Sequence, residues 1–169
     1  MKHLKNLLLT TAIILACNFS AQAQSKVAHI NTQELVESMP EMKSAKSELE
    51  KLAKTYETDI QAMATELQNK IKQYDAESST KTDEENAKRL QEVQSMEQSI
   101  RQYQSQAQQD LQKKELDLLR PITEKAKDAI LKVGNAQGFD YILDSSQGQG
   151  VIMANGKDLL SDVKSELGF

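Results

Sequence analysis

A long helical stretch without glycine separates two short strand-like pieces in this chain of 169 residues. The helical pattern covers residues 39–133, and the strand-like pieces are residues 27–31 and 139–144. Helices of such length exceed the diameter of a small globular domain. The sequence therefore predicts an α+β fold, in which a long antiparallel helical hairpin, a coiled-coil-like arm, emerges from a small β body.

Apolar residues in the first half of this stretch recur in steps of three and four, which places them on one face of a helix. They are Met42, Ala45, Leu49, Leu52, Tyr56, Ile60, Met63, Leu67, Ile71 and Tyr74. Ser38 with Glu41 three residues later predicts a capping box at the start of this helix, and Pro40 suits its first turn.

A polar segment, residues 75–81, interrupts the apolar pattern before a second helix. Thr82 followed by Glu85 predicts another capping box, so we expect the hairpin tip near residues 76–82. Lys114 is the one polar residue on the second apolar face, which otherwise consists of Leu90, Val93, Met96, Ile100, Tyr103, Ala107, Leu111, Leu118, Ile122, Ala126, Ala129 and Val133. The two helices are expected to be roughly 55 Å and 75 Å long.

Pro121 lies inside the second helix. A proline there removes one backbone hydrogen bond and clashes with the preceding turn, which costs about 3 kcal/mol unless the helix bends. One interpretation makes Pro121 a hinge where the arm meets the body. The other makes it a kink without a mechanical role.

The C-terminal part of the chain predicts short strands and one helix. Gly134 and Gly138 favour a helix end. Residues 139–144 alternate as a half-buried strand, residues 151–154 predict a further strand after a polar loop, and Asp158 suits the cap of a final amphipathic helix.

Three strands of this length cannot enclose a core, and their edges would remain open to aggregation. We therefore expect several copies to combine their strands into one closed barrel. The body would comprise residues 24–38 and 134–169, and the residues expected to build its shared core are Val27, Ile30, Tyr141, Leu143, Val151 and Met153.

The N-terminus has the pattern of a secretory signal peptide, residues 1–23. Lys2 and Lys5 precede an apolar run over residues 7–16, and cleavage is expected after Ala23, which predicts export to the periplasm. A rival interpretation takes Cys17 as an acylated lipoprotein N-terminus. No later stretch is apolar for long enough to predict an integral membrane segment in the mature chain.

The charge and the reactive residues exclude several classes of function. Because the signal carries two lysines and no acid, removing it changes the net charge from −4 to −6, which argues against a nucleic-acid partner. His29 is the only histidine left, and no nucleophile, base and orienting group accompany it. We expect neither catalysis nor a cofactor, and no calcium-loop pattern predicts a metal.

Three segments carry a resemblance to a known family: residues 26–36 (KVAHINTQELV), 39–41 (MPE) and 138–144 (GFDYILD). Their order and spacing around a long helical insert resemble the Skp (OmpH) family of periplasmic chaperones for outer-membrane proteins, over essentially the whole mature chain. The resemblance implies a homotrimer with a small β-barrel body. Its three helical hairpins would enclose a cavity that holds an unfolded client without ATP.

One departure from the family concerns charge. Its best-known members are basic, whereas residues 41–133 of this chain hold 16 basic and 18 acidic side chains. Electrostatic capture of acidic clients, and any site for lipopolysaccharide, is therefore not carried over to this chain.

The function expected is that of an ATP-independent holdase for unfolded outer-membrane β-barrel proteins, whose unpaired strands aggregate readily. Many weak contacts inside one enclosure suffice for such binding. The candidate contact residues lie in the outer hairpin: Met63, Leu67, Ile71, Tyr74, Met96, Ile100 and Tyr103. A position in the seam between the two helices also explains each of them, since an apolar stripe at helical spacing is usually core.

The charged residues among these positions are expected to form a solvated face, with pairs such as Glu66 and Lys70. A second function from a different class also fits the pattern: a structural coiled-coil tether or spacer of the envelope, anchored by lipid at Cys17. An acylated Cys17 at the mature N-terminus would favour this tether.

Overall fold

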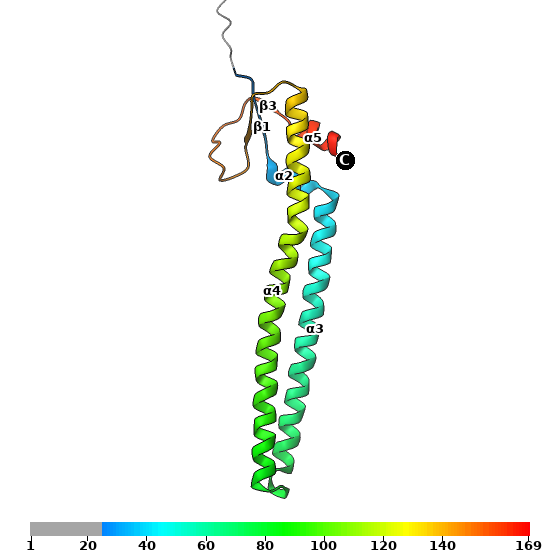
Figure 1. The fold of residues 1–169 in the computed structure, drawn as a ribbon, viewed down its shortest axis with the longest axis vertical. Coiled ribbons are helices and arrows are strands. Elements are labelled where there is room, and N and C mark those ends of the chain that lie inside the picture. The colour runs from blue at the N-terminus through cyan, green and yellow to red at the C-terminus, as the bar shows by residue number, and fades with distance from the viewer. Residues whose placement is uncertain (1–24) are drawn as a thin grey trace, which may run out of the picture.

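A computed structural model describes residues 25–169, so the expected signal peptide and Cys17 lie outside the described part of the chain. The elements in order are β1 (Val27–Ile30), α2 (Thr32–Ser38), α3 (Pro40–Glu77), the 3-10 turn η1 (Ser78–Thr80), α4 (Asp83–Ala136), β2 (Tyr141–Asp144), β3 (Lys157–Asp158) and α5 (Leu160–Leu167). The predicted α+β fold with a long helical hairpin is confirmed (Figure 1).

The hairpin dominates the molecule (Figure 1). With 38 residues α3 is about 57 Å long, and with 54 residues α4 is about 81 Å long. The two helices lie side by side from the tip to the start of α3, and α4 then continues alongside the strands. The extra length of α4 thus forms one wall of the body.

The start of α3 differs from the prediction. The predicted capping box of Ser38 and Glu41 is wrong, because the N-cap is Met39 and the Ser38 hydroxyl donates to the Leu35 carbonyl at 2.7 Å, within α2. A residue before proline avoids the helical conformation. Met39, at φ −64° and ψ 135°, therefore turns the corner between α2 and α3, and its side chain is buried.

Different local features determine where α4 begins and where it ends. At the tip, the predicted capping box is confirmed: the Glu85 N–H donates to the Thr82 hydroxyl at 3.2 Å, and the Thr82 N–H donates to the Glu85 carboxylate at 3.1 Å. At the other end α4 stops at Ala136, within the segment 134–138 predicted to end it, and Gly138 has a φ of 69°. The helix extends past Val133 and includes Gly134. A Cβ at this position would lie 2.3 Å from Cδ1 of Ile142, so glycine permits the helix to pack closely on β2.

The sheet is parallel, with the strand order β2-β1-β3. The strand predicted over residues 151–154 is wrong: these residues form part of a loop, and the third strand is Lys157–Asp158, which pairs with Ala28 and His29. Within residues 25–169, β2 and β3 flank β1, and no further strand pairs with the outer edge of either.

The core lies on one face of this sheet, between the strands and the helices. The largest fully buried side chains are Ile30, Leu35, Met39, Leu159 and Val163. They pack with one face of α4, which contributes Ile122, Ala126, Ala129 and Val133. The Asp158 carboxylate accepts the Leu160 N–H at 2.9 Å, although Leu159 is the N-cap of α5. Here "the body" means this core and its sheet, and "the arm" means residues 46–121.

Candidate functional site

The seven predicted contact residues are all half-buried on the facing sides of α3 and α4. Met63, Met96 and Ile100 line a shallow groove of about 320 Å³, and Ile71 and Tyr74 line a second of about 370 Å³ nearer the tip. Leu67 and Tyr103 lie closer to the middle of the arm. The positions agree with a seam between the helices, and contact with a client stays a prediction.

Ion pairs join α3 to α4 at both ends of the arm. Two lie near the body and two near the tip: Glu41–Lys125, Glu48–Lys114, Lys70–Glu92 and Glu77–Arg89. The polar Lys114 on the apolar face thus has a partner, Glu48, at 2.7 Å. The predicted pairing of Glu66 with Lys70 is wrong, because Lys70 reaches across the seam to Glu92.

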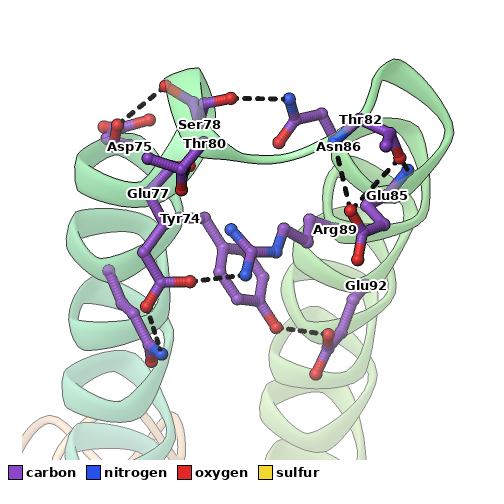
Figure 2. A network of polar contacts seen from close by, with 11 residues as sticks. Tyr74, Asp75, Glu77, Ser78, Thr80, Thr82, Glu85, Asn86, Arg89 and Glu92 are labelled. Atoms are coloured by element: carbon purple, nitrogen blue, oxygen red, sulfur yellow. Dashed lines mark hydrogen bonds and ion pairs between the residues drawn. The ribbon is translucent and has the colours of Figure 1, made fainter.

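The tip cluster consists of Lys70, Tyr74, Glu77, Arg89 and Glu92. Figure 2 shows Tyr74, Glu77, Arg89 and Glu92 between the two helices. The Tyr74 hydroxyl donates to Glu92 at 2.5 Å, and the Arg89 guanidinium lies 4.6 Å from the centre of the Tyr74 ring. Arg89 also donates to Glu77 at 2.5 Å. Its Nη1 is buried and has no hydrogen-bond partner in the described part of the chain, so the ring face is what stabilises that side of the cation.

These contacts hold both carboxylates of the tip cluster in the charged form. The hydrogen bond from Lys70, followed by that from Tyr74, lowers the pKa of Glu92 below its usual value of 4.5. Hydrogen bonds from Gln73 and then Arg89 lower the pKa of Glu77 in the same way. The tip is therefore closed by charged, hydrogen-bonded pairs at neutral pH.

The tyrosine bridge, made of Tyr56, Asp59, Tyr103 and Asp110, joins the helices in the middle of the arm. The two rings meet edge to face, with centroids 5.7 Å apart. The Tyr56 hydroxyl donates to Asp110 at 2.9 Å, and the Tyr103 hydroxyl donates to Asp59 at 2.7 Å. The bond to Asp59 raises the pKa of Tyr103 to about 12.

The polar side-chain pairs between α3 and α4 all follow one register. The residue numbers of each partnership add up to 162 or 166, from Glu41–Lys125 near the body through Tyr56–Asp110 to Glu77–Arg89 near the tip. The centre of this register falls at residues 81–83, where Thr82 caps α4. The turn at the tip thus decides which side chains meet along the whole arm.

The outer face of the sheet presents apolar side chains to solvent. Val27 is 43% exposed and faces Tyr141 across the strand pair, while Tyr141 and Leu143 are 60% and 46% exposed. Ile30, predicted to belong to the same set, is 1% exposed, because side chains alternate between faces and Ile30 points into the core. The shared barrel itself stays a prediction.

The loop between β2 and β3 extends to one side of the body (Figure 1). Of the residues predicted there, Val151 is half-buried and Met153 is 76% exposed. Sequence reasoning missed Ile152, which is fully exposed. The sequence contains a signal for this exposure, because Ile152 lies between two turns that contain glycine, Gly148 to Gly150 and Asn155-Gly156. This loop and the outer sheet face are the exposed apolar parts of the body.

Pro121 lies at the border between arm and body. Its own side chain is exposed, and the next residue, Ile122, is buried in the body core. This position suits a hinge between the two parts, and the hinge role remains a prediction.

The described residues 25–169 show little that supports chemistry. Nδ1 of His29 lies 3.3 Å from the Ser145 hydroxyl, and no carboxylate completes a set with them. No group of three or more histidine, cysteine or acidic side chains suitable for a metal occurs in this part of the chain. Among the same residues, no helix is long and apolar enough to cross a membrane.

Comparison with known proteins supports this architecture. The family model described as "Outer membrane protein (OmpH-like)" matches residues 26–167. The chain belongs to the OmpH-like family. One curated relative is the Chaperone protein Skp of Pectobacterium atrosepticum, 24% identical, over 92% of this chain and 93% of the relative. Another is the Chaperone protein Skp of Photorhabdus laumondii, 28% identical, over 79% and 81%.

A solved structure from the same family shares the fold. It is an OmpH-like protein from Caulobacter crescentus, with a TM-score of 0.77 and 20% identity, over 87% of this chain and 86% of that one. At this identity the likeness concerns the fold alone. It agrees with the long hairpin and small sheet of the OmpH-like chain described here.

Proposed function

We propose that this OmpH-like protein is an ATP-independent periplasmic holdase chaperone. Its client is an unfolded outer-membrane β-barrel protein, held between arms so that it does not aggregate. The observation that carries the proposal is the hairpin itself: the arm projects far beyond the body and is covered on only one face of each helix. Membership of the OmpH-like family and the chaperone relatives support the same function.

The arm suits weak binding at many points. Its apolar side chains are half-buried, so part of each is available to another chain, and methionines such as Met63 and Met96 adapt to varied partners. Weak contacts add up when several surfaces surround one bound chain. Release needs no motor, because folding of the client into its membrane is downhill.

The enclosure requires several copies, and the proposed assembly is a homotrimer. The exposed pairing of Val27 with Tyr141, the neighbouring Leu143 and the loop residues Ile152 and Met153 support self-association of the body. Exposed apolar patches of this kind mark interaction surfaces. Sedimentation that shows a stable folded monomer at micromolar concentration would contradict the homotrimer.

Light scattering of an outer-membrane β-barrel protein diluted from urea tests the holdase function. With one trimer equivalent per barrel, the scattering signal is expected to stay near that of the buffer. An unrelated helical protein of equal mass and charge serves as the control. Scattering that rises as fast with the OmpH-like protein as with the control contradicts the proposal.

A further inference from the structure

We propose that a groove in the middle of the arm binds the main chain of an extended, uncharged client segment through glutamine side chains. The inference rests on the proposed function and names a contact surface for it. This mid-arm groove lies between α3 and α4, has a volume of about 1060 Å³, and shares only Leu67 with the seven contact residues predicted from the sequence.

The lining of the mid-arm groove combines small and apolar side chains. Ala53, Ala64 and Ala107 leave the seam open, and Ile60 and Leu111 offer apolar surface beside them. Its α3 wall covers residues 53–68, about 24 Å of helix. A strand rises about 3.3 Å per residue, so the groove accommodates about seven residues of an extended chain.

Four glutamines border the groove from both helices. Gln61 and Gln68 come from α3, and Gln104 and Gln108 from α4. All four are exposed, and none of their side-chain amides is hydrogen-bonded to another residue within 25–169; Gln61 accepts only through its backbone carbonyl, from Thr65. By contrast, Gln106, two residues along α4 from both Gln104 and Gln108, donates to Asp110 at 2.9 Å. The groove therefore gathers amides that the hairpin does not use for its own stability.

Charge distribution along the arm sets this region apart. The interhelical ion pairs lie near the body and at the tip, and the tyrosine bridge joins the helices between them. Residues 98–109 of α4 include only one charged side chain, Arg101. The single charged residue that lines the groove, Glu57, is paired with Lys54 on its own helix at 2.8 Å.

A groove with four glutamine amides and one charged lining residue complements an unpaired main chain. Each residue of an unfolded chain carries one N–H donor and one C=O acceptor, and a glutamine amide offers both kinds of group. Main-chain groups covered without a partner are costly, so a partner of this kind is needed wherever the client leaves water. The apolar lining receives client side chains whatever their sequence, and no client charge is required.

A matched pair of peptides tests this inference with the full mature protein. One is an uncharged 12-residue peptide of alternating valine and threonine, and the other is the same peptide N-methylated at alternate residues, which removes main-chain donors. Fluorescence anisotropy is expected to show that N-methylation weakens binding by about tenfold. Equal affinity for the two peptides, or no binding of either, overturns the inference.

Two triple variants locate the effect. Gln61→Met, Gln104→Met and Gln108→Met together keep side-chain length and helix propensity but remove three of the four groove amides. This groove variant is expected to lose most of the discrimination between the two peptides. The control combines Gln91→Met, Gln98→Met and Gln102→Met, which are exposed positions of α4 outside the groove, and it is expected to discriminate as the unmodified protein does.

The outcomes separate this inference from the proposed function. If the groove variant discriminates between the peptides as the unmodified protein does, the glutamines are not the contact surface, even where aggregation of a barrel protein is suppressed. If the unmodified protein fails to suppress aggregation in the scattering assay, the holdase function itself is wrong. Circular dichroism on both variants checks that the helices are retained.

Discussion

The body and the arm of this chain are held together by different means. The body contains side chains with essentially no exposure, among them Ile30, Leu35 and Val163. Along the arm, residues 46–121, Ala107 is the one apolar side chain that is buried. The arm compensates with ion pairs at its ends and the tyrosine bridge in its middle.

Because of this difference, the body supplies stability and the arm supplies an adaptable surface. Burial of apolar side chains supplies most of the stabilisation of a fold, so the body carries it. Half-buried seams and exposed ion pairs contribute little each, and regions built from them open at low cost. A surface that must contact many unrelated chains gains from such an arrangement, because its side chains can rearrange without loss of the core.

The largest expected effect comes from creating a cavity in the core of the body. Leu35→Ala should lower the free energy of unfolding by about 2–5 kcal/mol, since it leaves a cavity among fully buried side chains. Leu67→Ala, in the half-buried seam, should lower the free energy of unfolding by about 1 kcal/mol or less, because the Leu67 side chain is only partly removed from water in the folded chain. Urea unfolding followed by circular dichroism measures both, and equal losses would contradict the contrast between body and arm.

A smaller effect is expected from charging the outer seam. Ile71→Lys combined with Ile100→Lys should speed release of a bound barrel protein by roughly tenfold, because weak apolar contacts multiply across the arms. The assembly state should not change, since the body is untouched. Leu116→Lys is the control, as this side chain is 59% exposed on the arm outside the seam. If the double variant retains its client normally, those positions are not contacts.

The hairpin was predictable because its signals are local. The steps of three and four gave both apolar faces, and Thr82 with Glu85 gave the tip. Boundaries failed where long-range packing decided them. Gly134 reads as a helix end but allows Ile142 to approach α4, and Pro40 at the start of α3 moved the cap from Ser38 to Met39.

The cross-seam partners were missed although the sequence contains them. Spacing within one helix suggested Glu66 for Lys70, whereas folding the chain about Thr82 brings Glu92 opposite Lys70. The same operation gives Glu48 as the partner of Lys114. The exposed face of the sheet was harder to predict from the sequence, because alternation alone did not say which of Val27 and Ile30 points into the core.

Acid should loosen the tip cluster of the arm. The pKa of Glu92 is lowered by the bonds from Lys70 and Tyr74, so its contribution to stability is present above pH 4.5 and is lost as the pH falls through the lowered value. Glu92→Gln should therefore lower the thermal midpoint of the arm at pH 7, and the difference from the unmodified protein should shrink below pH 4.5. Glu57→Gln is the control. It removes an exposed ion pair with Lys54 within one helix and should change the thermal midpoint less than Glu92→Gln does.

The smallest effect concerns the tyrosine bridge and appears at high pH. The hydrogen bond to Asp59 raises the pKa of Tyr103 from 10.0 to about 12, so the stability that it contributes is complete below pH 10 and is lost as the pH rises towards 12. Asp59→Asn should return the titration of Tyr103 towards 10, as followed by phenolate absorbance against a Tyr103→Phe reference. Tyr141→Phe removes an exposed tyrosine of the body and should leave this late titration in place. An ordinary pKa for Tyr103 in the unmodified protein would mean that the middle of the arm is open in solution, and the two helices would then be joined only at their ends.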